Sequence, residues 1–460
     1  GFYDKLLKIL ADRDEQEAKI NALISKGKIL ELVGRWEECE AVYEEALTLA
    51  RQTDNLKVIG LANNQLGYLL MLKGNYDDAS MYLEAAAAFY ESANHTKGIS
   101  KVYGNLGNLY FRQGNYEDAK SHFIRSIELG QTYKHTSSNA QIVANLGLTY
   151  MNLGKYDDGI EWQQSQLEIC EQVKDKSGMA TLYTNMGIVY FEKGDYDSAL
   201  KCYEKGLELS EELGNKLLTS IAVGCIGSVY ERKGHYDTAM EHFQKDLQLT
   251  QELGDKQGIS IALGLIGDLH SVRGEFDEAI EYMSQNLKIS EELGYQKGIA
   301  KAVNTLGDVY YFKNEFENSL KYYDRAIEVT RGIGNKLVLG FSLVEKGNVL
   351  LSMDKTKDAH AMIDEALEIA DDLGNPDLIF EAKILRAKVD SQEGETKKSE
   401  IILKELLNEA HEKKELAAVY YELSKITKNQ KHQIKALILY EDLYKETPHH
   451  LFKRRMEELD

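Results

Sequence analysis

The chain has 460 residues, of which 43% are apolar and 28% charged, and its 75 acidic and 55 basic residues give a net charge of −20. That apolar fraction is too high for an intrinsically disordered chain, and no stretch approaches the roughly 20 apolar residues of a membrane span. The acidic balance disfavours binding to nucleic acid or to an anionic membrane surface. We therefore expect a soluble, folded protein whose partners are neither nucleic acid nor membrane.

The four cysteines, Cys39, Cys170, Cys202 and Cys225, show no C-x-x-C spacing. The N-terminal residues also lack a basic segment followed by an apolar run. Both features favour a reducing compartment over secretion, so we expect a cytoplasmic protein.

The dominant feature of the sequence is a period of 40 residues. Glycine recurs at every fortieth position from Gly27 to Gly347, and a second glycine column begins at Gly34. An aromatic residue such as Tyr116 or Tyr236 follows two positions after this second column. A fixed period of this length indicates a repeat architecture in which each unit is one supersecondary element.

Each repeat is predicted to contain two helices. Apolar residues recur at helical spacing in a first stretch that includes Ile99 and in a second that includes Phe123. Gly114 lies between the two stretches, where a left-handed helix cap is needed. Asn314 and Asp354 replace it in two later units because short polar side chains tolerate that conformation.

In chain order, the period predicts five parts. Tyr3 and Leu7 fall in the columns of the second helix, so residues 1–10 are expected to be a partial second helix of a preceding repeat. The expected explanation is a fragment cut from a longer polypeptide, and the alternative is a solitary capping helix. The other parts are repeat 1 at 11–53, eight 40-residue repeats at 54–373, repeat 10 at 374–414, and an atypical C-terminal repeat with a capping helix at 415–460.

The connections between repeats carry a helix stop and a helix start. The segments L-G-N-K at 213–216, L-G-D-K at 253–256 and L-G-N-P at 373–376 each place a glycine before an Asn or Asp. The glycine suits the end of one helix, and the following residue suits the N-cap of the next. Asn215, Asp255 and Asn375 are therefore predicted N-caps, and Pro376 occupies the first helical position, where proline costs little.

The glycines of the first column lie inside a predicted helix, where each costs about 1 kcal/mol relative to alanine. Nine of them in register predict that a neighbouring helix passes too close for a Cβ atom. In the second helix, a usually small position is instead polar at Gln166, Asp246 and Asn286. These side chains are expected either to be hydrogen-bonded internally or to face a groove.

One unit carries the pattern L-G-x-x-Y, then G-x-Y-x-x-A and a further aromatic residue, at Leu106, Gly107, Tyr110, Gly114, Tyr116, Ala119 and Phe123. The pattern covers nearly the whole chain and resembles the tetratricopeptide repeat in its 40-residue version. The resemblance implies an all-α, right-handed superhelical solenoid of about ten to eleven helix-turn-helix repeats. Its concave wall, formed by the first helices, would bind extended peptides or partner helices. The proline common at the repeat end of this family is missing from almost every unit.

The resemblance also implies which residues line that wall. They lie mostly two or three positions before, or one, four or five positions after, each first-helix glycine. The expected partner-binding residues are Asn64, Gln65, Tyr68, Lys101, Asn105, Asn108, Phe111, Arg112, Asn145, Met151, Asn185, Glu231, Arg232, Asp268, Asn304, Asp308, Tyr311 and Asn348.

Among these residues, Asn105, Asn145 and Asn185 share one column. An amide offers both a donor and an acceptor, so this column is interpreted as a ladder that grips a peptide backbone. The equally weighted alternative is that the amides hydrogen-bond within the array. Later repeats offer a mixed-charge wall that includes Glu231 and Asp308, and no pattern typical of carboxylate-clamp chaperone adaptors is present.

No catalytic, cofactor or metal-binding constellation is predicted. The histidines are scattered without an H-E-x-x-H motif, and the adjacent His449 and His450 are expected to be solvated near the C-terminus. The acidic pairs at the ends of second helices, such as Glu211 and Glu212, are interpreted as solvent-facing charges. We therefore expect a protein that is not an enzyme.

Two functions remain open. The first is the C-terminal sensor or partner-recruiting region of a larger signalling protein, because the repeats resemble those fused to bacterial signalling ATPases, cyclases or kinases. The second is a free-standing scaffold similar to Pins-type adaptors or kinesin light chains, which hold partner peptides in the concave groove. The sequence assigns neither a particular partner nor an oligomeric state.

Overall fold

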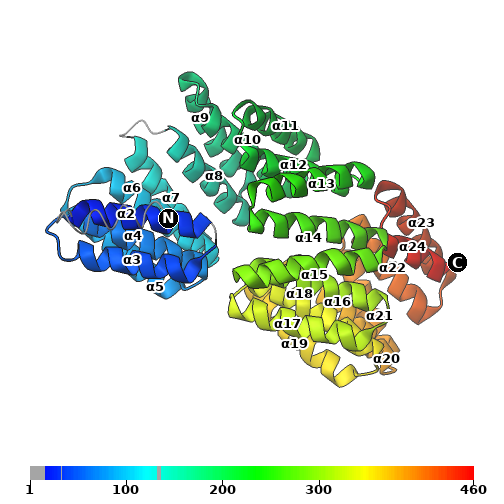
Figure 1. Cartoon of the computed structure of the whole chain (residues 1–460). Coiled ribbons are helices and arrows are strands. Elements are labelled where there is room, and N and C mark those ends of the chain that lie inside the picture. Colours follow the sequence, from blue (N-terminus) through cyan, green and yellow to red (C-terminus); the bar gives the residue numbers. More distant parts are fainter. Residues whose placement is uncertain (1–15, 33, 132–135) are drawn as a thin grey trace. The chain divides into compact units, whose positions relative to one another are not determined.

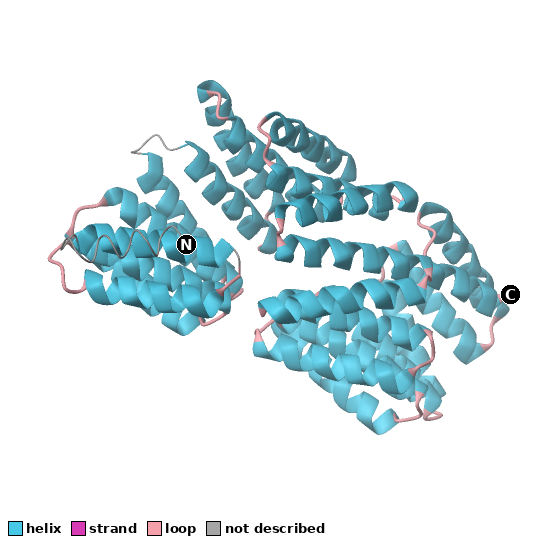
Figure 2. Ribbon diagram, viewed as in Figure 1, coloured by secondary structure: helices cyan, strands magenta, loops and turns pink. Residues whose placement is uncertain are grey.

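The computed structural model describes residues 16–32, 34–131 and 136–460 (Figure 1). The predicted partial helix at residues 1–10 lies outside this part of the chain. The described residues form helices joined by short loops, without a β-strand among them (Figure 2). None of these helices is long and apolar enough to cross a membrane.

The helices follow one another in pairs, and a further helix ends the chain. Each pair consists of a first helix with an even number and a second helix with the following odd number. The bounds are α2 Gln16–Leu32, α3 Trp36–Ala50, α4 Leu56–Lys73, α5 Tyr76–Ser92, α6 Thr96–Arg112, α7 Tyr116–Gln131, α8 Thr136–Asn152, α9 Tyr156–Val173, α10 Lys176–Glu192, α11 Tyr196–Glu212, α12 Lys216–Arg232, α13 Tyr236–Leu253, α14 Lys256–Arg273, α15 Phe276–Leu293, α16 Gln296–Phe312, α17 Phe316–Gly332, α18 Lys336–Ser352, α19 Thr356–Leu373, α20 Pro376–Gln392, α21 Thr396–Glu409, α22 Lys413–Thr427, α23 Gln430–Glu446 and α24 His450–Leu459.

The chain divides into two compact units between Ile226 and Gly227, inside α12. In each unit the two helices of a pair pack as an antiparallel hairpin, and the first helices of successive hairpins contact one another. This arrangement is the predicted stack of helical hairpins.

Close contact between the two helices of a hairpin explains the first glycine column. A Cβ on Gly107 would lie 2.6 Å from the Phe123 ring, and one on Gly307 would lie 2.8 Å from the Tyr323 ring. At these two positions the aromatic ring of the second helix rests on the glycine of the first, and at Gly267 the side chain is Met283 instead. The predicted close approach of a neighbouring helix is confirmed. Gly347 differs because a Cβ there would meet Leu385, on the first helix of the next hairpin, at 2.5 Å.

The turns within the hairpins confirm the predicted left-handed caps. Gly114 has φ +81°, and its replacements Asn314 and Asp354 both have φ +60°. The connections between hairpins use the same conformation, for example at Gly214 with φ +63° and at Lys174 with φ +59°.

The three predicted N-cap residues lie at the starts of their helices, and two of them make a capping hydrogen bond with the side chain. The Asn215 side chain accepts a hydrogen bond from the Leu218 backbone at 3.2 Å, and Asn375 accepts one from the Leu378 backbone at 2.8 Å. Asp255 occupies the N-cap position of α14 but makes no capping hydrogen bond with its side chain. The predicted position of the N-cap is therefore confirmed at Asp255, without a side-chain hydrogen bond.

Two of the polar residues at the small position of the second helix bond within the array. Asn286, 2% exposed, accepts hydrogen bonds from Ser260 at 2.8 Å and Ser290 at 3.0 Å. Gln166 is buried and donates to the Cys170 sulfur at 3.8 Å. For these two residues the structure shows the internal alternative rather than a groove-facing side chain.

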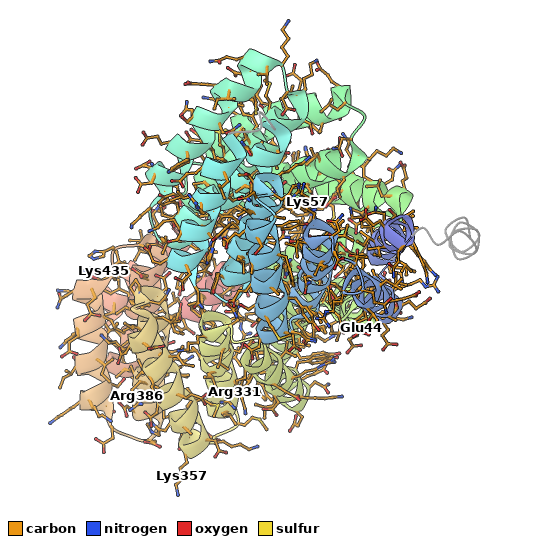
Figure 3. The ribbon with its side chains drawn as sticks, turned by 90° about the vertical axis from the view of Figure 1, so that its left-hand side faces the viewer. Glu44, Lys57, Arg331, Lys357, Arg386 and Lys435 are labelled. Carbon is orange, nitrogen blue, oxygen red and sulfur yellow. The ribbon has the colours of Figure 1, made fainter. Side chains whose placement is uncertain are left out.

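Charged side chains cover the outer surface, as Lys357 and Glu44 illustrate (Figure 3). Glu212, predicted to face solvent, pairs with Lys176 at 2.6 Å, and both side chains are about half exposed. Exposed pairs of this kind contribute roughly 0–1 kcal/mol each. These pairs keep the surface hydrated, whereas the packing of the hairpins depends on the apolar residues of the repeat.

Candidate functional site

The eighteen predicted partner-binding residues all lie on first helices, from α4 to α18. Those from Asn64 to Asn185 belong to the first unit, and those from Glu231 to Asn348 belong to the second. Consecutive first helices contact one another from α4 to α10 and from α14 to α18, and Glu231 of α12 interacts with Asp268 of α14, so the residues form one wall in each unit. We call these the first wall and the second wall.

On the first wall, the asparagine side chains bond to one another across neighbouring hairpins. Asn105 donates to the side-chain oxygen of Asn64 at 2.9 Å, and Asn145 donates to that of Asn108 at 2.8 Å. Asn185 differs because it donates to the backbone oxygen of Thr181 on its own helix. The structure therefore shows the internal hydrogen bonds that were the alternative to a peptide-gripping ladder.

Burial separates these side chains into two groups. Asn64 and Gln65 are 1% and 5% exposed, and Asn105 is 9% exposed, so they act mainly in packing. Tyr68 and Met151 are half-buried, whereas Arg112 is exposed and accessible to a partner. The side-chain amides of this wall therefore mainly join neighbouring hairpins by hydrogen bonds.

On the second wall, charged residues of consecutive first helices contact one another. Asp268 of α14 accepts a hydrogen bond from Thr305 at 2.9 Å and pairs with Lys301 at 2.7 Å, and both of these partners lie on α16. On α16 itself, Asp308 accepts a hydrogen bond from the Tyr323 hydroxyl. The mixed-charge character predicted for this wall is present.

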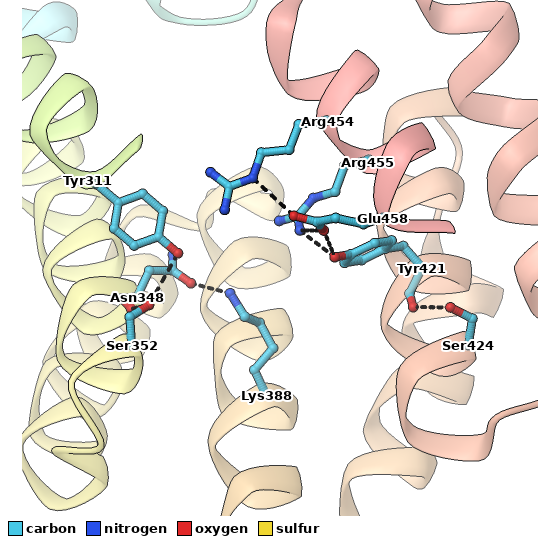
Figure 4. Close-up of polar contacts among 9 residues, drawn as sticks. All are labelled: Tyr311, Asn348, Ser352, Lys388, Tyr421, Ser424, Arg454, Arg455 and Glu458. Carbon is cyan, nitrogen blue, oxygen red and sulfur yellow. Dashed lines mark hydrogen bonds and ion pairs between the residues drawn. The ribbon is translucent and has the colours of Figure 1, made fainter. Parts of the chain in front are cut away.

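Three carboxylates on the first helices α12, α18 and α20, which we add to the second wall, form no direct ion pair among the described residues. Glu231 and Glu381 make neither a hydrogen bond nor an ion pair, and Glu345 accepts only a 3.3 Å hydrogen bond from Asn348. Cationic side chains still act on each of them from a distance: Arg232 and Lys301 on Glu231, Lys388 on Glu345, and Lys414 and Lys388 on Glu381. Lys388 itself bonds to the Asn348 oxygen (Figure 4). Each of the three therefore lacks a direct ion pair, which a cation from outside the chain could provide.

Burial raises the pKa of these carboxyl groups. The pKa of Glu231 rises to about 7, first because of burial and then because of the nearby Asp268 charge. Burial likewise raises the pKa of Glu345, and Asp308 and Glu381 add to the effect. The pKa of Glu381 is also raised, again mainly by burial. A buried carboxylate without a counter-ion is unfavourable, so a cationic ligand would stabilise the ionised form.

The sequence analysis missed Glu345, Glu381, Lys301 and Lys388, although the repeat columns contain the signal. Glu345 lies in the column of Asn105 and Asn145, and Lys388 lies in the column of Asp268, Asp308 and Asn348. Lys388 was missed because the first-helix glycine that marks this register is replaced by Ala387.

Helix α24 is attached to the second unit by a partly buried charge cluster. Arg455 donates to the Tyr421 hydroxyl at 2.6 Å and to Glu458 at 2.9 Å, and its guanidinium lies 4.2 Å from the Tyr421 ring centroid. Arg454 pairs with Glu458 at 3.0 Å and, in the view of Figure 4, extends from α24 toward the side of Lys388. The cluster fixes α24 to α22.

The same helix also contacts the beginning of the second unit, 178 residues earlier in the chain. The His450 ring lies 3.3 Å from the Val272 backbone oxygen and packs edge-on against Phe312 and Phe276, at 4.6 and 5.2 Å between centroids. Burial lowers the pKa of His449 to about 4 and also lowers that of His450. The prediction that these histidines are solvated is wrong, because α24 docks His450 against α14 and Phe312 of α16, and His449 caps α24 by accepting from the Leu451 backbone at 3.0 Å.

The described cysteines are free thiols. Burial raises the pKa of Cys39 to about 12 and of Cys202 to about 11, so neither is an activated thiolate at neutral pH.

Comparison with known families identifies the repeat. A tetratricopeptide-repeat family model matches residues 57–132, 137–212, 218–292 and 298–372, and a second tetratricopeptide-repeat model matches residues 22–57. No curated protein sequence is significantly similar to the chain.

Several solved structures share the architecture. A Rap protein complexed with Competence and Sporulation Factor is 14% identical, with a TM-score of 0.53 over 78% of this chain and 99% of that chain. The apo form of the quorum sensor NprR from B. thuringiensis is 18% identical, with a TM-score of 0.49 over 78% of this chain and 99% of that one. A signal transduction ATPase with a tetratricopeptide repeat sensor, from Pyrococcus horikoshii, is 15% identical, with a TM-score of 0.49 over 75% of this chain and 55% of that one. At these identities the likeness shows the fold alone.

Proposed function

Because the chain belongs to the tetratricopeptide-repeat family, we propose that it is a non-catalytic module that binds a protein or peptide partner along its first helices. Stacked repeats of this kind present extended surfaces, which suit elongated partners. The Rap structure that shares the fold holds a bound factor, and this precedent supports the proposal.

The observation that carries the proposal is the set of unpaired carboxylates on the second wall. Glu231, Glu345 and Glu381 come from α12, α18 and α20, and none of them forms a direct ion pair with a described residue, although lysine and arginine side chains lie near each one. Isolated buried charges are unfavourable and are retained where a partner neutralises them. The partner therefore presents basic groups, either Lys and Arg side chains or a free N-terminal amine.

A pair of model peptides tests this proposal. Fluorescent ten-residue peptides that alternate Lys with Ala, or Glu with Ala, are titrated against the full chain at low salt. We expect the Lys peptide to bind the wild-type chain and to lose affinity on Glu345→Gln combined with Glu381→Gln. The control is the double variant Glu328→Gln with Glu368→Gln, which removes the same number of charges at exposed positions of second helices. It should leave the affinity for the Lys peptide nearly unchanged.

The control separates a site from general attraction by a chain of net charge −20. If both double variants weaken binding equally, the affinity comes from overall charge and the second-wall site is rejected. If the Glu peptide binds as well as the Lys peptide, the assignment of a basic partner is also rejected.

Within this role, we propose that the array serves as the C-terminal sensor or partner-recruiting region of a larger cytoplasmic signalling protein. The resemblance of its repeats to those fused to bacterial signalling proteins supports this assignment. The size of the native polypeptide, detected with an antibody to the array, tests it. A native product much larger than 52.1 kDa is expected, whereas one of that size favours a free-standing adaptor.

A further inference from the structure

Three residues depart from the repeat pattern together at the corner where the start of α19 meets the end of α20. The position of His360 is apolar in the five preceding repeats, and that of Asp390 is aromatic in most repeats. The position of Glu393 is basic in five repeats. The equivalent residues are Ile160, Leu200, Met240, Ile280 and Leu320 for His360, Tyr110, Tyr150, Tyr190, Tyr230 and Tyr310 for Asp390, and Lys73, Lys193, Lys233, Arg273 and Lys313 for Glu393.

The fold brings these three side chains together. The His360 Nε2 atom lies 3.2 Å from a carboxylate oxygen of Glu393. One candidate donor atom from each of His360, Asp390 and Glu393 lies within 4.8 Å of the other two. Each side chain could bind a metal ion through nitrogen or oxygen, and the equivalent positions of the neighbouring repeats carry no such set.

Asp390 provides a second, independent observation. The residue is only 1% exposed, and its Oδ1 atom accepts a hydrogen bond from Lys398 at 2.8 Å. Its Oδ2 atom is buried and has no hydrogen-bond partner among the described residues. A buried carboxylate oxygen without a partner requires an explanation, and a cation at this corner provides one.

We propose that His360, Asp390 and Glu393 bind a divalent transition-metal ion of the zinc class. An imidazole with two carboxylates is a ligand set that such ions accept. The two carboxylates and the Lys398 ammonium leave one net negative charge when His360 is neutral, which favours a cation.

The geometry needs only a small adjustment to accept zinc. Bonds of about 2.0–2.2 Å in a tetrahedral arrangement place the ligand atoms roughly 3.3–3.5 Å apart. The side chains of His360 and Glu393 are 27% and 34% exposed, so they can rotate toward a metal ion, whereas Asp390 is held by burial. Water occupies the fourth position.

The test is a titration of the metal-free full chain with ZnSO₄, in which isothermal titration calorimetry measures the heat of binding. We expect saturable binding of one ion. A replacement that restores the residue of another repeat, His360→Leu or Glu393→Lys, should keep the fold and weaken binding. The loss should exceed the roughly 10–100-fold that removal of an outer-shell partner causes. Asp390→Asn keeps the shape of the side chain and should also weaken zinc binding.

Two control variants separate this site from other zinc-binding groups. Glu395→Lys makes the same charge change as Glu393→Lys two residues away, and His411→Ala removes an exposed histidine. Neither should alter the titration. The proposal is overturned if the wild-type chain shows no saturable binding, or if the control variants weaken binding as much as the site variants. In either case the corner contains only the His360–Glu393 and Lys398–Asp390 ion pairs.

Discussion

The side-chain amide of Asn105 donates a 2.9 Å hydrogen bond to the side-chain oxygen of Asn64 on the preceding hairpin. Both residues are almost completely buried, so water cannot replace this bond easily. The bond ties α6 to α4 and gives a polar column of the wall a structural role.

Asn105→Ala should therefore destabilise the array. The substitution leaves a buried oxygen of Asn64 without its donor, and we expect the free energy of unfolding to fall by about 1–3 kcal/mol. Urea denaturation followed by circular dichroism measures the change. Asn152→Ala is the control, because this exposed side chain bonds only to its own helix. Equal stability of the two variants would contradict the structural role of Asn105.

Gly307→Ala should lower stability through overpacking. The added Cβ would lie 2.8 Å from the Tyr323 ring, which is itself 1% exposed and cannot move away easily. We expect a loss of about 1–3 kcal/mol, measured as a decrease in the thermal unfolding midpoint. At Gly332, at the end of α17, nothing lies within 4 Å of an added Cβ. Gly332→Ala should be neutral or stabilising, by up to about 1 kcal/mol.

Lys174→Gly should stabilise the first unit. Lys174 has φ +59°, a left-handed conformation that costs a side-chain-bearing residue roughly 1–2 kcal/mol. Gly214 occupies the equivalent position one repeat later with φ +63° and no atom near its missing Cβ. Gly214→Ala is therefore expected to destabilise by a similar amount through the backbone alone. Opposite shifts of the urea midpoint are the expected result, and shifts of the same sign would refute this explanation.

The stability of the second unit should depend on pH through Glu231. Its pKa is raised from 4.5 to about 7, so the folded state retains a proton that the unfolded state loses at lower pH. The contribution to stability is complete below pH 4.5 and is lost as the pH rises through 7. Between these values the slope is at most about 1.4 kcal/mol per pH unit for one proton. Glu231→Gln should flatten this part of the profile, measured by urea denaturation at pH 5, 6 and 7.5, and an unchanged slope would contradict the assignment.

The repeat period made the hairpins, their glycine contacts and their left-handed caps predictable from the sequence. Each of these features depends on residues that are close in sequence or separated by a fixed distance, such as Gly307 and Tyr323. The same local logic predicted the caps at Asn314 and Asp354, where a short polar side chain replaces glycine.

The chemistry of the walls was less predictable because it depends on which polar groups find partners. Asn64 and Asn105 were predicted to be wall residues. Their mutual hydrogen bond depends on how far one hairpin is displaced along the next, and the alignment of the repeats does not give this displacement. His450 was predicted to be solvated because no periodicity links α24 to α14. That contact spans 178 residues and is visible only in the folded unit.

The docking of α24 onto α14 also restricts how the second unit can evolve. In an open array, repeats can be gained or lost because each one touches only its neighbours. Here an inserted repeat would carry α24 away from Val272, Phe276 and Phe312, and a deleted repeat would drive it into them. The number of hairpins in this unit is therefore fixed by the closing contact, and length variation is expected in the first unit instead.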